Sequence, residues 1–202
     1  MQRPSLKRRA ARLFGQWGVF LRGFIEHPRM VGSIIPSSRF TIAKMLERVK
    51  WEECSVFVEY GPGVGTFCQP VLDRLPRDGK LIVIDTNPLY VDYLAKHFTD
   101  PRFHAVLGSA ADVEAIVHAH GAKHADYVLS GLPFSTLPVG VGPAIAEATY
   151  RIIRPGGAFL VYQFSAKARD YMARHFERIE SGFEALNILP CQLFWGWKEP
   201  RD

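Results

Sequence analysis

Apolar runs and helical patterns alternate along most of this chain. Seven short runs rich in β-branched and aromatic residues predict strands, over residues 55–60, 81–85, 104–108, 126–130, 158–164, 183–186 and 192–197. Between them, apolar positions at helical spacing predict helices, most clearly over residues 88–97 and 141–153. Strands separated by helices indicate a parallel sheet, whereas the short link before the last run favours an antiparallel pair at its edge. The pattern therefore predicts a seven-stranded, doubly wound α/β domain.

Proline, glycine and serine predict several boundaries. The Pro-Gly-Gly sequence at residues 155–157 is expected to end a helix before the fifth strand. Ser37 or Ser38 can cap a helix that continues through Val49. The chain then divides into a basic amphipathic helix over residues 1–26, a lid over residues 27–50 and a main domain over residues 51–202.

Residues 6–24 place their apolar side chains on one side of a helix and their charges around the flank and the opposite side. An apolar face with aromatic residues, backed by arginines, is typical of a helix that lies in a membrane interface. The same stripe also suits a helix that packs on the domain. The density of basic residues favours the membrane, since each contributes about 1 kcal/mol near an anionic surface. The residues expected to bind the membrane are Lys7, Arg8, Arg9, Arg12 and Trp17.

Positive charge is concentrated at the start of the chain. The whole chain carries a net charge of +5 and residues 1–30 carry +6, so the remainder carries −1. A protein that grips nucleic acid would spread its basic residues around the binding face, so no nucleic-acid partner is expected. Anionic phospholipids at a membrane surface are the expected partners, and the pattern predicts no particular oligomeric state.

Cysteine usage and hydropathy indicate a cytoplasmic location. The three cysteines form no Cys-x-x-Cys pair, which indicates a reduced protein without structural zinc. His118, His120 and His124 have no carboxylate or cysteine at ligand spacing, so no metal site is expected. We expect no transmembrane span and no signal peptide, because the apolar runs are too short. These features predict a protein that is peripheral on the inner face of the cytoplasmic membrane.

The most specific chemical pattern is a strand that ends in an acid and passes directly into a glycine-rich turn. The first predicted strand is followed by glycines at every second position, Gly61, Gly63 and Gly65. Such glycines let a ligand approach the backbone, and Glu59 at the strand's end can hold a cationic group. The next strand ends in Asp85, where a carboxylate can bind both hydroxyls of a ribose.

Two kinds of nucleotide-like ligand share this geometry. A pyrophosphate-binding loop usually reads Gly-x-Gly-x-x-Gly and leaves room for phosphates. Here the glycines are closer together and an acid precedes them, which suits the cationic methionine part of S-adenosylmethionine (SAM). The pattern resembles the class I SAM-dependent methyltransferases, whose Rossmann-like sheet has seven strands with the last one antiparallel. The residues expected to bind SAM are Ser37, Ser38, Glu59, Gly61, Gly63, Gly65, Thr66, Asp85, Thr86, Ser109, Ala110 and Ser130.

Two later loops bear on the substrate. After the third strand, class members have Gly-Asp-Ala against the adenine, so either Ser109 or Asp112 is expected to contact the adenine amine here. After the fourth strand, residues 130–134 read Ser-Gly-Leu-Pro-Phe. Adenine N-methyltransferases, including the rRNA dimethylating kind, have Asn or Asp where this chain has Gly131. The missing amide disfavours an rRNA substrate.

The assembled motifs resemble the bacterial phospholipid N-methyltransferase family. The resemblance rests on His-Pro and Pro-Ser-Ser within residues 27–38, on the glycine loop, on Ser-Gly-Leu-Pro at residues 130–133 and on Gln-Phe at residues 163–164. It implies methylation of phosphatidylethanolamine and its mono- and dimethyl derivatives toward phosphatidylcholine, with the N-terminal helix on the membrane. Related enzymes methylate ornithine lipids, and no residue excludes that substrate. An rRNA adenine or small-molecule methyltransferase and a non-enzymatic membrane-surface protein are the remaining alternatives.

Methyl transfer to an amine requires a neutral nitrogen in line with the sulfonium methyl. An amine with a pKa near 10 is mostly protonated at pH 7, so it must first lose a proton to a nearby acceptor. The candidate catalytic groups are the side chains of Tyr60, Ser130, Gln163 and His27 and the backbone carbonyl of Gly131. Much of the rate is expected to come from alignment of sulfur, carbon and nitrogen.

Overall fold

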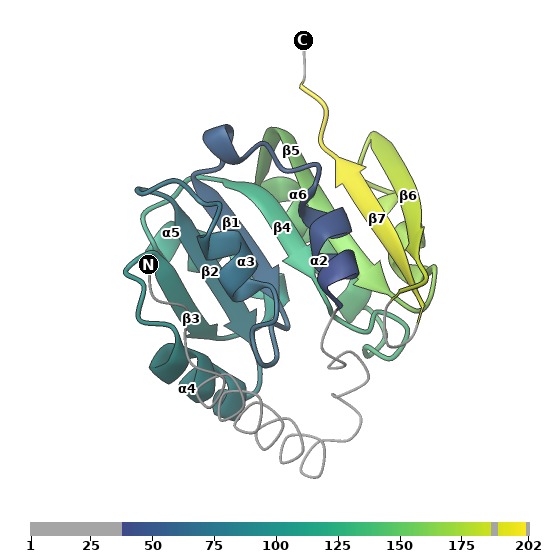
Figure 1. Cartoon of the computed structure of the whole chain (residues 1–202). Helices are drawn as coiled ribbons and strands as arrows, with labels where there is room; N and C mark the ends of the chain where they lie inside the picture. Colours follow the sequence, from purple (N-terminus) through teal and green to yellow (C-terminus); the bar gives the residue numbers. More distant parts are fainter. Residues whose placement is uncertain (1–37, 187–189, 201–202) are drawn as a thin grey trace.

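A seven-stranded sheet forms the centre of the protein (Figure 1). The computed structural model describes residues 38–186 and 190–200. The strands are β1 (Val56–Tyr60), β2 (Lys80–Asp85), β3 (Phe103–Leu107), β4 (Ala125–Ser130), β5 (Ile153–Gln163), β6 (Arg178–Glu184) and β7 (Cys191–Trp197). They lie in the order β3-β2-β1-β4-β5-β7-β6, and β7 runs antiparallel to both β5 and β6. The predicted doubly wound α/β sheet with an antiparallel last strand is confirmed.

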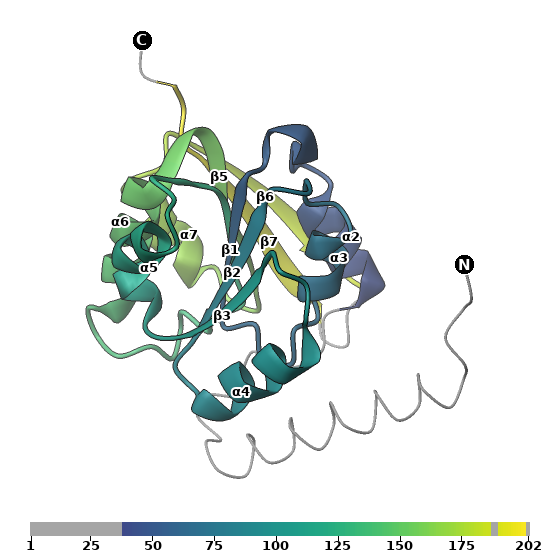
Figure 2. The same cartoon turned by 90° about the vertical axis from the view of Figure 1, so that its left-hand side faces the viewer.

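Helices cover both faces of the sheet (Figure 2). One face carries α2 (Arg39–Leu46), α3 (Cys68–Leu72) and α4 (Pro88–His97), and the other carries α5 (Val113–Ala119), α6 (Val141–Ile152) and α7 (Lys167–Met172). Two short 3-10 helices, η1 (Trp51–Glu53) and η2 (Ala110–Asp112), lie in the connections. Alternate strand residues face the two layers, so Phe57 belongs to one apolar cluster and Val58 to the other. None of the described helices is both long and apolar enough to cross a membrane.

The helix α2 belongs to the body of the domain. The Ser38 hydroxyl accepts a hydrogen bond from the Thr41 backbone N–H at 3.2 Å, which caps the helix as the sequence predicts. Met45 is fully buried, and Trp195 Nε1 donates to its carbonyl at 3.2 Å. The carboxyl half of the predicted lid, residues 27–50, therefore packs into the core. The helix ends at Leu46 and does not continue through Val49.

The predicted boundary at residues 155–157 is wrong. β5 begins at Ile153, because its pairing with β4 continues across the Pro-Gly-Gly sequence as an irregularity. Ala125 pairs with Ile153, and Tyr127 then pairs with Ala158. A Cβ at residue 157 would lie 2.8 Å from Ile153 Cγ2, so glycine is needed where the strand bends.

The sixth strand also starts earlier than predicted, at Arg178 and not at residue 183. β6 is an edge strand, and most of its side chains are exposed or half-buried. An edge strand needs no apolar alternation on its open side, so its first residues lack the pattern that predicts strands.

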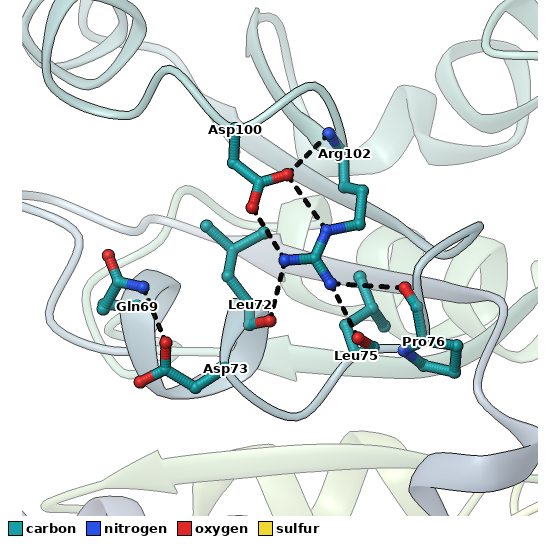
Figure 3. A network of polar contacts seen from close by, with 7 residues as sticks. All are labelled: Gln69, Leu72, Asp73, Leu75, Pro76, Asp100 and Arg102. Atoms are coloured by element: carbon teal, nitrogen blue, oxygen red, sulfur yellow. Dashed lines mark hydrogen bonds and ion pairs between the residues drawn. The ribbon is translucent and has the colours of Figure 1, made fainter. Parts of the chain in front are cut away.

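The guanidinium of Arg102 joins the end of α3 to the start of β3 (Figure 3). It donates to the backbone carbonyls of Leu72 at 3.0 Å, Leu75 at 2.7 Å and Pro76 at 3.2 Å. The end of a helix leaves carbonyls without intrahelical partners, and Arg102 satisfies them. Its hydrogen bond to Asp100 lowers the pKa of that carboxyl. This network holds α3, the helix that follows the glycine loop, against the sheet.

Candidate functional site

A cavity of about 540 Å³ lies at the carboxyl ends of the parallel strands. The pairing brings these ends level, since Tyr60 pairs with both Ile84 and Ser130. Four loops therefore meet at one edge of the sheet. The cavity is lined by Gly61, Gly63, Ile84, Asp85, Thr86, Asn87, Tyr90, Gly108, Ser109, Ala110, Leu132, Pro133, Thr136, Leu137, Pro138, Val141 and Ile145.

The three glycines of the first loop have different roles. Gly61, Gly63 and Gly65 have φ angles of +61°, +54° and +77°, which side chains rarely adopt. Gly61 and Gly63 line the cavity. Gly65 does not, and a Cβ there would lie 2.7 Å from Leu94 on α4. The first two glycines can therefore admit a ligand to the backbone, whereas the third allows the loop to pack on α4.

Asp85 lies on the cavity wall at the end of β2. Its Oδ1 accepts a hydrogen bond from the Asn87 backbone N–H at 2.8 Å, which orients the carboxylate. Burial raises the pKa of Asp85 to about 6, against the opposing effect of backbone hydrogen bonds from Asn87, Gly63 and Thr86. A carboxylate held in this way can accept hydrogen bonds from a vicinal diol. Thr86 also lines the cavity and is exposed.

Glu59 is buried beneath the glycine loop, with an exposed fraction of 1%. The Cys68 thiol donates to its carboxylate at 3.5 Å. Burial, together with the charge of Asp85, raises the pKa of Glu59 to about 8, against the opposing effect of the Cys68 hydrogen bond. Glu59 lies behind the cavity wall and is not part of its lining. Two carboxyl groups with raised pKa values below one cavity favour a cationic ligand.

The third loop supplies Ser109 and Ala110 to the cavity. The Ser109 hydroxyl accepts from the Ala111 backbone N–H at 3.2 Å and caps η2, so it is already engaged as an acceptor. Asp112, the alternative predicted contact to an adenine amine, does not line the cavity. Ala110 is buried there beside the half-buried Ser109.

The cavity also has an apolar wall that the sequence analysis missed. It comes from the loop after β4 and the start of α6, at Leu132, Pro133, Leu137, Pro138, Val141 and Ile145. Leu132 directly follows the predicted site residues Ser130 and Gly131, and this position in the sequence was the one signal that could have identified it. The same cavity is lined by Asp85 and Asn87. A cavity that combines apolar side chains with a carboxylate able to bind a diol suits a nucleoside.

Tyr90 and Asn87 were also missed. The Tyr90 hydroxyl is buried on the cavity wall and makes no hydrogen bond with the residues that the structure describes. Burial raises the pKa of this phenol to about 12, so it is a neutral donor. A buried hydroxyl without a partner is a ready contact for a bound ligand. Asn87 caps α4 by accepting from the Leu89 N–H at 3.0 Å.

Two of the predicted catalytic side chains, those of Tyr60 and Ser130, are buried and form hydrogen bonds inside the domain. The Tyr60 side chain is fully buried on the α6 face, and its hydroxyl lies 3.0 Å from the Thr149 hydroxyl. Burial also raises the pKa of Tyr60, so the structure argues against proton transfer by this residue. The Ser130 hydroxyl is buried and accepts from the Leu132 N–H at 3.2 Å. Neither side chain lines the cavity.

Gln163 lies at the end of β5, with both amide atoms buried and without a hydrogen-bond partner among the described residues. Ser38 caps α2, and Thr66 is half-buried in the glycine loop, outside the cavity lining. Several predicted residues lie outside the described part of the chain: His27, Ser37, Lys7, Arg8, Arg9, Arg12 and Trp17. Within the described residues, no three His, Cys, Asp or Glu side chains gather as a metal site.

A relative of known activity matches this chain over most of its length. An ornithine lipid N-methyltransferase of Singulisphaera acidiphila is 26% identical over 179 residues, which cover 88% of this chain and 93% of that protein. The TrkA-N domain family matches residues 62–135, less than half of the chain.

Solved structures of methyltransferases share the fold. The N-methyltransferase NodS of Bradyrhizobium japonicum is 12% identical with a TM-score of 0.64, over 80% of this chain and 96% of that chain. A Burkholderia thailandensis 1,6-didemethyltoxoflavin-N1-methyltransferase with bound S-adenosylhomocysteine is 14% identical with a TM-score of 0.63, over 99% of this chain and 93% of that chain. At these identities the likeness concerns the fold, which is that of class I methyltransferases.

The two carboxyl groups predict a pH dependence for SAM binding. Ionised Glu59 and Asp85 attract the cation, but a Glu59 with a pKa of about 8 is mostly protonated at pH 7.5 and must lose its proton when the cation binds. This loss becomes harder as the pH falls, so SAM affinity should fall between pH 7.5 and pH 6. We expect SAM affinity to fall by at least about tenfold, since binding that requires the loss of one proton weakens about tenfold for each pH unit below the pKa. The ligand's α-amine, which titrates at about pH 8, only gains positive charge as the pH falls, so its titration cannot account for a loss of affinity. Calorimetry in buffers of different ionisation enthalpy should also detect proton release on binding.

The control variants isolate the role of Glu59. Glu59→Gln removes the titrating group and should flatten this pH dependence, whereas Glu52→Gln on η1, at the opposite end of β1, should leave it unchanged. Equal pH dependence in the Glu59→Gln variant and the unmodified protein would exclude Glu59 from cation binding.

Proposed function

We propose that this SAM-dependent methyltransferase transfers methyl groups to the amine of a membrane lipid, and that its substrate is an ornithine lipid. The observation that carries the proposal is the match over 88% of the chain to an ornithine lipid N-methyltransferase, together with a cavity built for a cationic nucleoside. The sequence motifs favoured phosphatidylethanolamine, and the comparison supports the ornithine alternative better.

The residues of the cavity fit SAM. Asp85 can accept from the ribose hydroxyls, and Gly61 and Gly63 leave the backbone open to the methionine part. The adenine fits between Ala110 and the apolar wall, where Leu132 lies. Buried Glu59 can lose its proton and supply negative charge to the cation when SAM binds. SAM supplies an electrophilic methyl group on a sulfonium, and the protein's part is to align it with a nucleophile.

The loop after β4 supports an aliphatic amine over a nucleic-acid base. Gly131 lacks the amide side chain that adenine N-methyltransferases carry at this position. The chain outside residues 1–30 has a net charge of −1, which gives no electrostatic attraction for RNA. Both features therefore favour a lipid amine over rRNA as the substrate.

The chain's own residues can prepare the amine for transfer. A lipid amine that enters this edge leaves water, and desolvation lowers its pKa toward neutrality. Gln163 has two buried amide atoms without partners in the described chain, so it can accept one N–H and orient the nitrogen. The Gly131 carbonyl stays a candidate acceptor, as does His27, which lies outside the described residues.

We further propose that residues 1–26 hold the enzyme on the cytoplasmic face of the membrane. Their basic amphipathic pattern would place the active edge near lipid head groups, so that a lipid amine could enter without leaving the bilayer. These residues lie outside the described part of the chain, and the proposal rests on sequence alone.

A lipid panel tests the substrate. The protein is incubated with methyl-labelled SAM and liposomes that contain an ornithine lipid, phosphatidylethanolamine or neither, and the lipids are then separated. We expect label in the ornithine lipid, and none when its free amine is acetylated beforehand. Label in phosphatidylethanolamine alone would overturn the ornithine assignment, and label in rRNA with no lipid product would overturn the lipid assignment.

Liposome flotation tests the membrane proposal. Replacing Lys7, Arg8, Arg9 and Arg12 with glutamine removes about 4 kcal/mol at roughly 1 kcal/mol per residue, enough to abolish a modest association. Binding by the unmodified protein should rise with the anionic lipid fraction and weaken with salt. Trp17→Ala should weaken binding with little change in salt dependence, and both variants should keep their SAM affinity. If the unmodified protein does not float on anionic liposomes, the interfacial helix is wrong.

A further inference from the structure

Tyr162 occupies the space that a side chain at residue 131 would need. A Cβ at residue 131 would collide with the Tyr162 hydroxyl oxygen and lie 2.9 Å from Cζ of the same ring. The φ angle of Gly131 is not in the left-handed region, so its backbone would accept any residue. The space next to the Gly131 backbone is therefore filled by a phenol hydroxyl from the neighbouring strand.

This hydroxyl lies beside the wall of the SAM cavity. Ser130 pairs with Val161, so Gly131 and Tyr162 are the next residues on each of the two parallel strands. Leu132, which follows Gly131, lines the cavity, and a Cβ on Gly61 would lie 2.9 Å from its Cδ2. The hydroxyl is thus close to the point where the first and fourth loops meet.

The ring of Tyr162 is held from two directions. Its backbone lies inside β5, where it pairs with Leu193 of β7. Its ring packs on Phe67, with centroids 5.0 Å apart and planes at 33°. Phe67 is fully buried and follows the glycine loop, so the same loop that contacts the ligand also positions the phenol. A group on a strand with a packed ring is well suited to precise orientation.

We propose that the Tyr162 hydroxyl contacts the methyl-acceptor amine and replaces the amide that adenine N-methyltransferases carry at the position of Gly131. This inference rests on the proposed function and names the residue that orients its substrate. A phenol hydroxyl can accept a hydrogen bond from an amine N–H, as the oxygen of an amide does.

The transfer step assigns the hydroxyl a defined role. The neutral amine donates one N–H to the Tyr162 oxygen, which turns the nitrogen lone pair toward the methyl carbon. The lone pair forms the N–C bond as the C–S bond breaks, and the electron pair of that bond stays on sulfur. The products are a thioether and an ammonium ion, which then releases one proton to solvent. The tyrosine remains neutral throughout.

Steady-state kinetics on ornithine-lipid liposomes test the role. Tyr162→Phe keeps the ring and removes the hydroxyl, so kcat should fall by at least about tenfold, as for loss of one aligned hydrogen bond. SAM affinity and thermal stability should stay near those of the unmodified protein. The matched control is Tyr150→Phe, which removes a surface hydroxyl that donates to Glu177 at 2.6 Å and should leave kcat unchanged.

A double-mutant cycle with Gly131→Ala gives a second, independent measurement. The added methyl must displace the hydroxyl, so kcat should fall in the Gly131→Ala protein. If both changes act through the hydroxyl, Gly131→Ala should cost much less in the Tyr162→Phe background, and the effects should not multiply.

The outcomes separate this inference from the function that it assumes. A protein that binds SAM but methylates no aminolipid removes the proposed function. Lipid methylation with full kcat in Tyr162→Phe overturns the role of Tyr162 alone. Multiplicative effects in the cycle also overturn the role of Tyr162, because Gly131→Ala then acts through another group. This criterion holds even if the Tyr162→Phe protein is partly unfolded.

Discussion

The parallel pairing of β1 with β2 on one side and β4 on the other determines where the chemistry of this protein can occur. Tyr60 pairs with Ile84 and with Ser130, so three strands end at the same level. The loops that follow must then meet at one edge, and they contribute Gly61, Asp85 and Leu132 to a common cavity. A slip in this register would separate the carboxylate from the glycine loop and remove the site.

The same constraint places two acids under the site. Glu59 and Asp85 occur near the ends of adjacent buried strands, and burial raises the pKa of both. Without a nearby cation their ionised forms are costly, because burial removes both carboxylates from water. A cation reverses this balance by stabilising the charged forms. The preference for a sulfonium ligand thus follows from burial combined with strand register, more than from any single hydrogen bond.

Local patterns allowed much of the fold and part of the site to be predicted. The glycine loop, Asp85 and the Ser109–Ala110 turn each follow an apolar strand directly, so sequence position alone places them at the ligand edge. The direction of a side chain within a buried strand is harder to predict. Tyr60 and Tyr162 both lie near strand ends, but Tyr60 faces the core and Tyr162 reaches Gly131. In a strand buried on both faces the apolar run does not alternate, and nothing in the sequence distinguishes its two faces.

The apolar wall was missed for a different reason. Leu137, Val141 and Ile145 reach the cavity because α6 packs on the sheet through Ile145 and Ala148 and brings its first turn over the site. That placement depends on tertiary packing. The periodicity of α6 predicts an amphipathic helix but not the position at which the helix packs. The irregular start of β5 is similar, since the bend at Gly157 depends on contact with Asp126 and Ile153.

We propose that this edge of the sheet binds SAM through Asp85. Calorimetry with SAM on Asp85→Asn and on the unmodified protein tests it most directly, because the substitution keeps the shape of the side chain and removes its charge. Two charge-assisted hydrogen bonds of roughly 1.5–3 kcal/mol each would be weakened, so the affinity should fall by at least about tenfold. Equal SAM affinity in the two proteins, both folded, would contradict the account.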